Sequence, residues 1–264
     1  DKMKKIVAIV ICMCICLVTE CTVVEADESA SLYKADINTR EITLYGLSSS
    51  YDGILTIPEE IATEYKLSVS NAKNVSYRVS DGDNIVVDDK GNVGILYKTW
   101  YTYGNVSYTH MLEGKKPDSV KTSFEQGDAT VTVTADSSEF KVKVHVIAYS
   151  VVYADNKIKE YIANNITGKN LSDIDLMNKI AEYPASFDYG DEHSGYDTMI
   201  IFGSGDCWAS TSLVLKMCDL LGIKAWARNG NKDTGAGGGH MNALVNYNGA
   251  YYDCLLYTSD AADE

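Results

Sequence analysis

Apolar and polar residues alternate in short runs between residues 30 and 147, which is the pattern of β-strands with one buried face. The clearest run places Val131, Val133 and Ala135 on one face of a strand. We expect strands at 41–45, 75–79, 85–87, 129–135 and 140–146. An Asp-Lys-Gly-Asn segment at 89–92 is a turn signal between two strand-like runs. Short strands with frequent turns predict a small antiparallel β-sandwich.

Near residue 150 the apolar positions change to helical spacing. We expect helices at 155–165, 172–183 and 207–221, and strands at 223–228, 240–247 and 250–253. Ser172 and Asp175 form a capping box at the start of the second helix, and Pro184 follows its end. Gly222 occupies a C-cap position after the third helix. This region therefore predicts an α+β unit, in which helices come first and a meander of strands packs on the third helix.

The third helix begins at Cys207, directly after a cap-like Ser-Gly-Asp segment. In the first turn of a helix, unpaired N–H groups and the positive end of the helix dipole favour a thiolate over a thiol. Trp208 opens the apolar stripe of this helix, so we expect it in the core or in a pocket wall. Cys218 lies roughly 16 Å further along the helix axis, so it can neither form a disulfide with Cys207 nor share a metal ion with it.

Both ends of the sequence differ from the rest of it. Residues 1–26 resemble a secretory signal peptide, with a lysine-containing start at Met3, an apolar core at 6–18 and a small-residue cleavage site, and residues 1–2 resemble upstream read-through. The apolar core is too short for a membrane span, and Glu20 disfavours a lipid anchor on Cys21. We therefore expect a protein that is secreted or held on the extracellular surface of a bacterium, with no membrane span after signal cleavage.

Residues 254–264 resemble the translation of a transposase sequencing adapter, so we expect the native sequence to break off after Asp253; a genuine polar tail is the alternative. The whole sequence has 37 acidic and 23 basic residues, which gives a net charge of −14. So acidic a chain is a poor candidate for binding nucleic acid or an anionic membrane.

Cys207, His240 and Asp253 form a candidate catalytic set in that order along the chain. His240 opens one predicted strand, and Asp253 closes the next strand across a hairpin. Because neighbouring strands lie about 5 Å apart, an imidazole and a carboxylate on one face can come within hydrogen-bond reach. The carboxylate would fix the ring tautomer, and the imidazole would take the thiol proton.

Four motifs carry a resemblance to the transglutaminase-like superfamily of papain-type thiol enzymes, over about 155–253. They are Gly-Asp-Cys-Trp-Ala at 205–209, Gly-Ile-Lys-Ala at 222–225, Gly-His-Met-Asn at 239–242 and Tyr-Tyr-Asp at 251–253. The resemblance implies Cys207 as nucleophile, His240 as base and acid, and Asp253 as the residue that orients the ring. The backbone N–H of Cys207 would be one oxyanion donor, and no cofactor or metal is implied.

The resemblance leaves the second oxyanion donor open. Tyr189 is our first choice for this donor, and His193 is the second choice. His193 and Trp208 are also the candidate walls of a substrate pocket. The glycine-rich segment 229–239 is expected to be a flap beside His240 rather than a phosphate cradle, because no Lys- and Ser/Thr-bearing helix follows it.

The order of strands and turns over 27–147 resembles the group 2 bacterial Ig-like domains of surface proteins, with a long tyrosine-rich insertion at 96–122. The predicted fold class is thus multidomain: a signal peptide at 1–26, an all-β Ig-like sandwich at 27–147, and an α+β transglutaminase-like domain at 148–253, truncated at its end. Four tyrosines of the insertion favour a half-buried sheet or loop, with sugar stacking as the alternative: Tyr97, Tyr101, Tyr103 and Tyr108.

The remaining polar clusters favour structural roles. Four aspartates fit turns better than a calcium loop: Asp81, Asp83, Asp88 and Asp89. His110 and His145 are isolated histidines in β-strand surroundings, which favours surface or hydrogen-bonded core positions.

Two functions follow from the sequence. The first is a secreted or surface cysteine acyl-transfer enzyme that acts on a protein or peptide, cell-wall peptide included, and resolves a thioester with water or with an amine. The second is a non-enzymatic surface adhesion protein with a degenerate transglutaminase-like domain.

Overall fold

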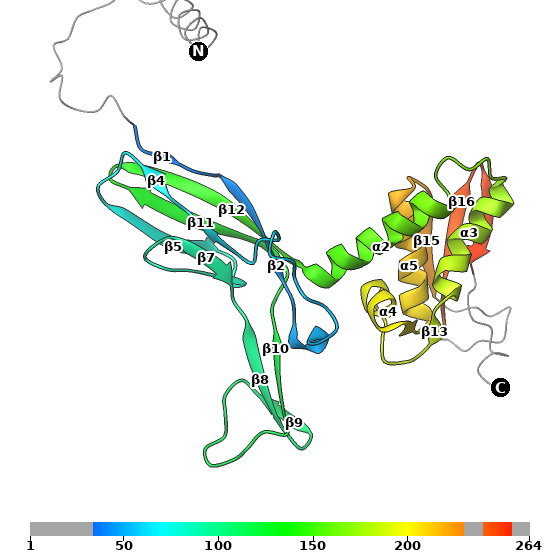
Figure 1. Ribbon diagram of the computed structural model, residues 1–264, viewed down its shortest axis with the longest axis horizontal. Helices are drawn as coiled ribbons and strands as arrows, with labels where there is room; N and C mark the ends of the chain where they lie inside the picture. The colour runs from blue at the N-terminus through cyan, green and yellow to red at the C-terminus, as the bar shows by residue number, and fades with distance from the viewer. Residues whose placement is uncertain (1–33, 230–239, 255–264) are drawn as a thin grey trace, which may run out of the picture.

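The computed structural model describes residues 34–229 and 240–254. The predicted signal peptide, nearly all of the predicted flap and the residues beyond Cys254 lie outside these ranges. The described residues form a mixed fold with four helices and several small β-sheets (Figure 1). Its buried apolar residues form two clusters, one over residues 37–146 and one over residues 158–254.

Two β-sheets enclose the first core. A four-stranded sheet has the order β2-β12-β11-β5, and a three-stranded sheet has the order β3-β7-β6. The strands are β2 (Glu41–Gly46), β3 (Glu64–Lys66), β5 (Val75–Asp81), β6 (Ile85–Val87), β7 (Asn92–Ile95), β11 (Gly127–Ala135) and β12 (Ser138–Ala148). Val131 and Val144 of one sheet and Val93 of the other are fully buried in the same cluster. A short pair, β1 (Asp36–Ile37) and β4 (Val69–Ser70), completes this unit.

One strand pairing differs from the predicted antiparallel arrangement. β2 runs parallel to β12, with Leu44 opposite Val146. Parallel neighbours need a long crossover connection, and here the connection contains the intervening strands of the unit. The alternation of apolar residues gave the buried face correctly, but it carries no information on strand direction.

His145 joins three strands of the four-stranded sheet. Its Nδ1 lies 2.6 Å from a carboxylate oxygen of Asp128 on β11, and its Nε2 lies 2.7 Å from one of Glu41 on β2. The hydrogen bond to Asp128, followed by that to Glu41, raises the pKa of His145 above its usual value. The predicted structural role of this histidine is confirmed, since both ring nitrogens have partners.

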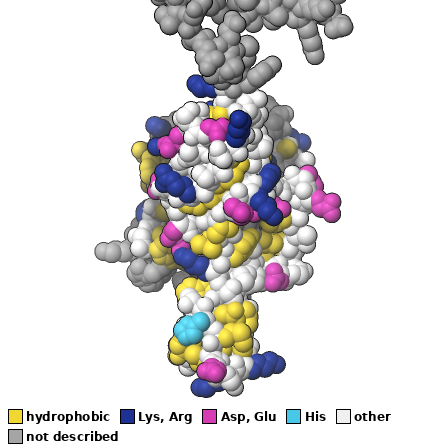
Figure 2. Space-filling model, turned by 90° about the vertical axis from the view of Figure 1, so that its left-hand side faces the viewer, with side chains coloured by type: hydrophobic (Ala, Val, Ile, Leu, Met, Phe, Trp, Pro, Cys, Tyr) yellow, Lys and Arg dark blue, Asp and Glu magenta, His cyan; other side chains and the backbone are white. Residues whose placement is uncertain are grey.

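The tyrosine-rich insertion is a three-stranded antiparallel sheet that projects from the first unit (Figure 1). We call residues 96–123 the arm. Its strands are β8 (Lys98–Tyr103), β9 (Val106–Tyr108) and β10 (Ser119–Ser123), with β8 in the centre. Figure 2 shows hydrophobic side chains gathered on the arm at the bottom of the view. The prediction of a half-buried sheet is confirmed for Tyr101, Tyr103 and Tyr108, whereas Tyr97 is 41% exposed.

Helices and a second sheet form the second unit. The helices are α2 (Tyr149–Asn165), α3 (Asp173–Ala185), α4 (Tyr196–Phe202) and α5 (Cys207–Leu220), and the main sheet has β15 (Lys224–Asn229), β16 (Met241–Tyr247) and β17 (Ala250–Cys254) in that order. Apolar residues of α5, such as Leu213 and Met217, share a core with Ala243 and Val245 of β16. A minor pair is β13 (Asp188–Tyr189) with β14 (Ser204–Gly205).

Two helix predictions need correction. α2 begins at Tyr149 rather than residue 155, because Tyr149 and Ala154 extend its buried stripe back to the end of β12. The predicted loop before Cys207 contains α4, a short helix that ends at Gly203 in the left-handed conformation (φ 81°). Propensity alone gives a seven-residue helix little stability, and burial of Met199 stabilises it here.

Most local signals at element ends are confirmed, but Pro184, expected to follow the end of the second helix, lies inside α3, which runs to Ala185. The Ser172 side chain accepts a hydrogen bond from the backbone N–H of Asp175 at 3.2 Å. Asn248 and Gly249 both have positive φ (50° and 81°), as a type I′ hairpin turn requires. Asp88 accepts from the backbone N–H groups of Lys90 and Asn92, which is the predicted turn role. Within the described ranges, no helix is long and apolar enough to cross a membrane.

Candidate active site

The chain path brings the candidate residues to one end of the second unit. α5 is followed after a short connection by β15, which packs on it and runs back along it. β16 is antiparallel to β15, so it starts at the end where α5 starts, and β17 returns to that end. Cys207 at the start of α5, His240 just before β16 and Asp253 near the end of β17 therefore share this end.

Cys207 is the first residue of α5 and is partly exposed. Asp206 is the N-cap: one of its carboxylate oxygens accepts from the backbone N–H of Ala209 at 2.8 Å, and the other accepts from the hydroxyl of Ser194 at 2.6 Å. Because the Asp206 carboxylate accepts from the N–H of Ala209, it does not occupy the backbone N–H of Cys207. The start of α5 therefore keeps a backbone donor beside an accessible thiol.

Gly205 is required by the packing just before Cys207. A Cβ at this position would lie 2.7 Å from Cβ of Ala209 and 2.9 Å from Cγ of Met199. Only glycine lets the β14 backbone approach α5 and α4 this closely. The predicted Gly-Asp-Cys motif thus consists of a close-approach residue, a cap and a thiol.

Tyr189 lies beside this motif. β13 pairs in parallel with β14, and the register sets Tyr189 opposite Gly205. A hydrogen bond to Asp191 is the main cause that raises the pKa of the Tyr189 phenol, followed by burial and by the nearby charges of Asp191, Cys207 and Asp206. The phenol is therefore within electrostatic range of the thiol, and its hydrogen is engaged by Asp191. Its ring is 55% exposed.

His240 contributes a buried and unsatisfied nitrogen. Its Nε2 has no hydrogen-bond partner among the described residues and almost no contact with solvent. An unpaired buried polar group costs roughly 1–3 kcal/mol, so such groups are uncommon in native proteins and often mark functional sites.

Asp253 is engaged by other residues. Its Oδ1 accepts from Nδ2 of Asn242 at 2.6 Å, and its Oδ2 accepts from the Arg228 guanidinium. The sheet register sets Asp253 opposite Leu244, four residues along β16 from His240. Although Asp253 and His240 lie at the same end of the sheet, the described structure does not bring this carboxylate to Nε2 of His240.

The two candidate pocket residues, His193 and Trp208, have different surroundings. The ring of His193 stacks on Phe202 with centroids 4.3 Å apart, and its carbonyl oxygen accepts from the N–H of Asp206 at 3.0 Å. Trp208 is 44% exposed, so of its two expected positions the core is wrong, and the pocket wall stays a prediction. The buried stripe of α5 starts one residue later, at Ala209, which turns the indole toward solvent.

Cys218, the second cysteine of α5, lies in the core. It is fully buried, and burial raises the pKa of its thiol to about 12. At neutral pH this sulfur is an uncharged core group. The described part of the chain has no cluster of three or more His, Cys, Asp or Glu that could hold a metal ion.

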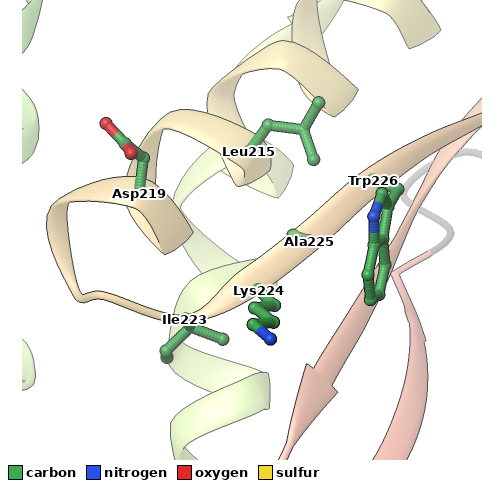
Figure 3. Close-up of a pocket in the computed structure, with 6 residues that line it drawn as sticks. All are labelled: Leu215, Asp219, Ile223, Lys224, Ala225 and Trp226. Atoms are coloured by element: carbon green, nitrogen blue, oxygen red, sulfur yellow. The ribbon is translucent and has the colours of Figure 1, made fainter.

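A separate hollow of about 430 Å³ lies between α5 and the edge strand β15 (Figure 3). Leu215 and Asp219 of α5 line one side, and residues 223–226 line the other. None of the candidate catalytic residues lines this hollow, so it does not belong to the candidate active site.

Sequence reasoning missed several residues of this region. Ser194 supports the cap, Asn242 is 2% exposed and holds Asp253, and Arg228 closes that network. The signal for Asn242 was an amide at an alternate position of a strand, two residues after His240. The residues next to Arg228 in the sequence gave no signal that it pairs with Asp253.

No family model and no curated protein matches the chain. A crystal structure of a TGase is 18% identical to it, with a TM-score of 0.34, over 39% of this chain and 31% of that chain. The chain thus spans less than a third of that protein.

Proposed function

We propose that this protein is a secreted or surface-held cysteine acyl-transfer enzyme, with a transglutaminase-like domain that attacks peptide or glutamine amide bonds through Cys207. The observation that carries the proposal is the position of Cys207: a partly exposed thiol on the first residue of a capped helix. The chain path that brings His240 and Tyr189 to the same end supports it.

In the proposed reaction, a ring nitrogen of His240 takes the proton from the Cys207 thiol. The thiolate attacks the amide carbonyl carbon, and the C–N bond then breaks while His240 returns the proton to the leaving amine. The resulting thioester is resolved by water, which gives an acid, or by a primary amine, which gives a new amide. In either case the free thiol is restored.

Two donors are proposed for the oxyanion that forms during attack. One is the backbone N–H of Cys207, which the N-cap leaves unused. The other is the phenol of Tyr189, whose single O–H is hydrogen-bonded to Asp191 and would have to turn from that carboxylate to the oxyanion. Losing one such donor typically lowers kcat by about 10²–10³-fold.

The substrate is proposed to be a protein or peptide, cell-wall peptide included. The catalytic residues do not separate hydrolysis from transamidation, because both proceed through the same thioester. The choice depends on whether water or an amine reaches that thioester first.

The test is the alkylation rate of Cys207 as a function of pH, with Cys218 as the buried internal control. We expect Cys207 to react quickly well below pH about 8.5, the value for a free thiol, and His240→Ala to remove that advantage. Amine incorporation and peptide cleavage assays would then assign the acceptor. A Cys207 that titrates as an ordinary thiol and ignores the His240 variant would contradict the enzyme proposal.

The second candidate is a surface adhesion protein with a degenerate catalytic domain. It is favoured by one observation: Asp253 is bound to Asn242 and Arg228, while Nε2 of His240 has no partner among the described residues. An unreactive Cys207 in the experiment above is the result that this candidate predicts.

A further inference from the structure

We propose that the arm carries a binding site for an acidic oligosaccharide, independent of the chemistry at Cys207. The site is a hollow of about 400 Å³ between the arm and the short helix η1 (Ser49–Tyr51). This volume is within the usual range for small-ligand sites, about 300–1,000 Å³.

The hollow combines one aromatic ring with many hydroxyl groups. Trp100 is 37% exposed and offers its indole to the hollow. Eight of the ten lining residues are serines or threonines: Ser48, Ser49, Ser50, Thr102, Ser107, Ser119, Thr122 and Ser123. An aromatic face suits the C–H face of a sugar ring, and hydroxyls that both donate and accept suit its hydroxyl groups.

Internal hydrogen bonds hold both walls of the hollow in place. The indole N–H of Trp100 donates to Oγ of Ser123 at 3.2 Å, which fixes the plane of the ring. On the other wall, Oγ of Ser49 accepts from the N–H of Thr122 at 2.8 Å, which ties η1 to β10. The site is therefore preorganised, which lowers the entropic cost of binding a flexible ligand.

The hydroxyls retain hydrogen-bonding capacity despite these contacts. Thr102 and Ser107 share one hydrogen bond at 2.9 Å, and Ser48 and Ser50 share another at 2.6 Å. Each pair keeps one donor hydrogen and several lone pairs, because a hydroxyl offers one donor and two acceptor positions.

Charge selects an acidic ligand. Lys121 is the charged residue that lines the hollow, and no ion pair with it is found within the described ranges, whereas Lys98 nearby is paired with Glu125. The arm has four lysines and two acidic residues in a protein with a net charge of −14. A carboxylated sugar in the hollow could therefore pair with the Lys121 ammonium.

Other occupants fit less well. A peptide strand would need apolar pockets for alternate side chains, and this wall is hydroxylic. A second copy of the chain would need an interface of roughly 800 Å² per partner, which cannot be supplied by a small hollow alone.

The experiment is to measure binding of the mature full-length protein to immobilised oligosaccharides, with isothermal titration for any sugar that binds. The set contains uronic-acid, muramic-acid and sialylated oligosaccharides together with neutral counterparts of equal length. We expect carboxylated sugars to bind. Trp100→Ala should lower their affinity about tenfold or more, equivalent to about 1.4 kcal/mol, and Lys121→Gln should lower it severalfold and weaken its salt dependence.

Controls separate this site from the fold and from Cys207. Lys115→Gln changes an arm lysine that does not line the hollow and should leave affinity unchanged, as should Cys207→Ala. Circular dichroism checks that the Trp100 variant keeps its sheet, and the Lys121 variant tests the site without removing the ring. The proposal fails if no carboxylated sugar binds, if neutral sugars bind equally well, or if both variants bind normally. It also fails if the same variants abolish binding to anionic lipid vesicles or to a sugar-free peptide instead.

Discussion

Nδ2 of Asn242 donates a hydrogen bond to Oδ1 of Asp253 at 2.6 Å, across the β16–β17 pair. The amide is buried, and its own oxygen accepts from Nε of Arg228 at 3.2 Å. A polar network thus links three adjacent strands, β15, β16 and β17, at the end of the sheet where β16 begins, just after His240. Asp253 therefore has a structural role in this arrangement, whatever its role in catalysis.

Asp253→Asn is expected to change the chemistry of Cys207 less than His240→Ala does. The carboxylate is bound to Arg228 and Asn242 rather than to Nε2 of His240, so the pH profile of Cys207 alkylation should stay near that of the wild type. Loss of the half-exposed ion pair should lower the free energy of unfolding by about 0–1 kcal/mol. A profile that shifts as far as that of His240→Ala would instead identify Asp253 as the orienting residue.

Asn242→Ala is expected to destabilise the second unit more than Asp253→Asn. The amide is 2% exposed and makes two hydrogen bonds, and its removal leaves Asp253 and Arg228 without a buried partner. The expected loss is about 1–3 kcal/mol, measured by urea unfolding. Arg228→Met is the matched control, since it removes a half-exposed member of the network; an equal or larger loss for that variant would contradict this ranking.

Two substitutions of Asp206 separate its role as helix N-cap from the effect of its negative charge on Cys207. Asp206→Asn keeps an acceptor for the N–H of Ala209 but removes a negative charge next to Cys207. Alkylation of Cys207 should therefore extend to lower pH, because a nearby anion disfavours the thiolate. Asp206→Ala also removes the cap, which should cost about 0.5–2 kcal/mol of stability in thermal or urea unfolding. Equal stability of the two variants would show that the cap contributes nothing.

His145 should make the first unit more stable in mildly acidic solution. Hydrogen bonds to Asp128 and then Glu41 raise the pKa of this imidazole, so folding favours the protonated ring. That stabilisation is fully present below the unfolded pKa of 6.5 and is lost as pH rises through the folded pKa. Denaturant unfolding of the wild type and His145→Gln should differ most below the unfolded pKa of 6.5 and progressively less as the pH rises above it. A difference in unfolding free energy that grows with pH would contradict stabilisation by the protonated His145 ring.

Gly205→Ala should disrupt the approach of β14 to α5. The new methyl group would lie 2.7 Å from Cβ of Ala209, too close for ordinary contact. Overpacking of this kind costs about 1–3 kcal/mol, and the displaced Cys207 should alkylate with an altered pH profile. Gly94→Ala is the control, because the nearest neighbour of its added Cβ is 3.9 Å away. Equal stability of both variants would mean that the backbone shifts without cost.

The sequence by itself determined the features that depend on neighbours a few residues apart. The cap at Asp206, the capping box at Ser172 and the turn at Asn248 were all predicted, because each hydrogen bond or φ angle is set within four residues. The alternating runs also identified the buried faces of the long strands, since side-chain direction has a period of two residues.

Only the tertiary structure decided which distant groups meet. Arg228 lies 25 residues before Asp253, and their pairing depends on the register of three strands rather than on either residue's surroundings in sequence. The same holds for the parallel pairing of β2 with β12 and for the hollow between Ser49 and Trp100. Local patterns fix turns, caps and faces, whereas the partner of a polar side chain is chosen by packing among all the groups that the fold brings within reach.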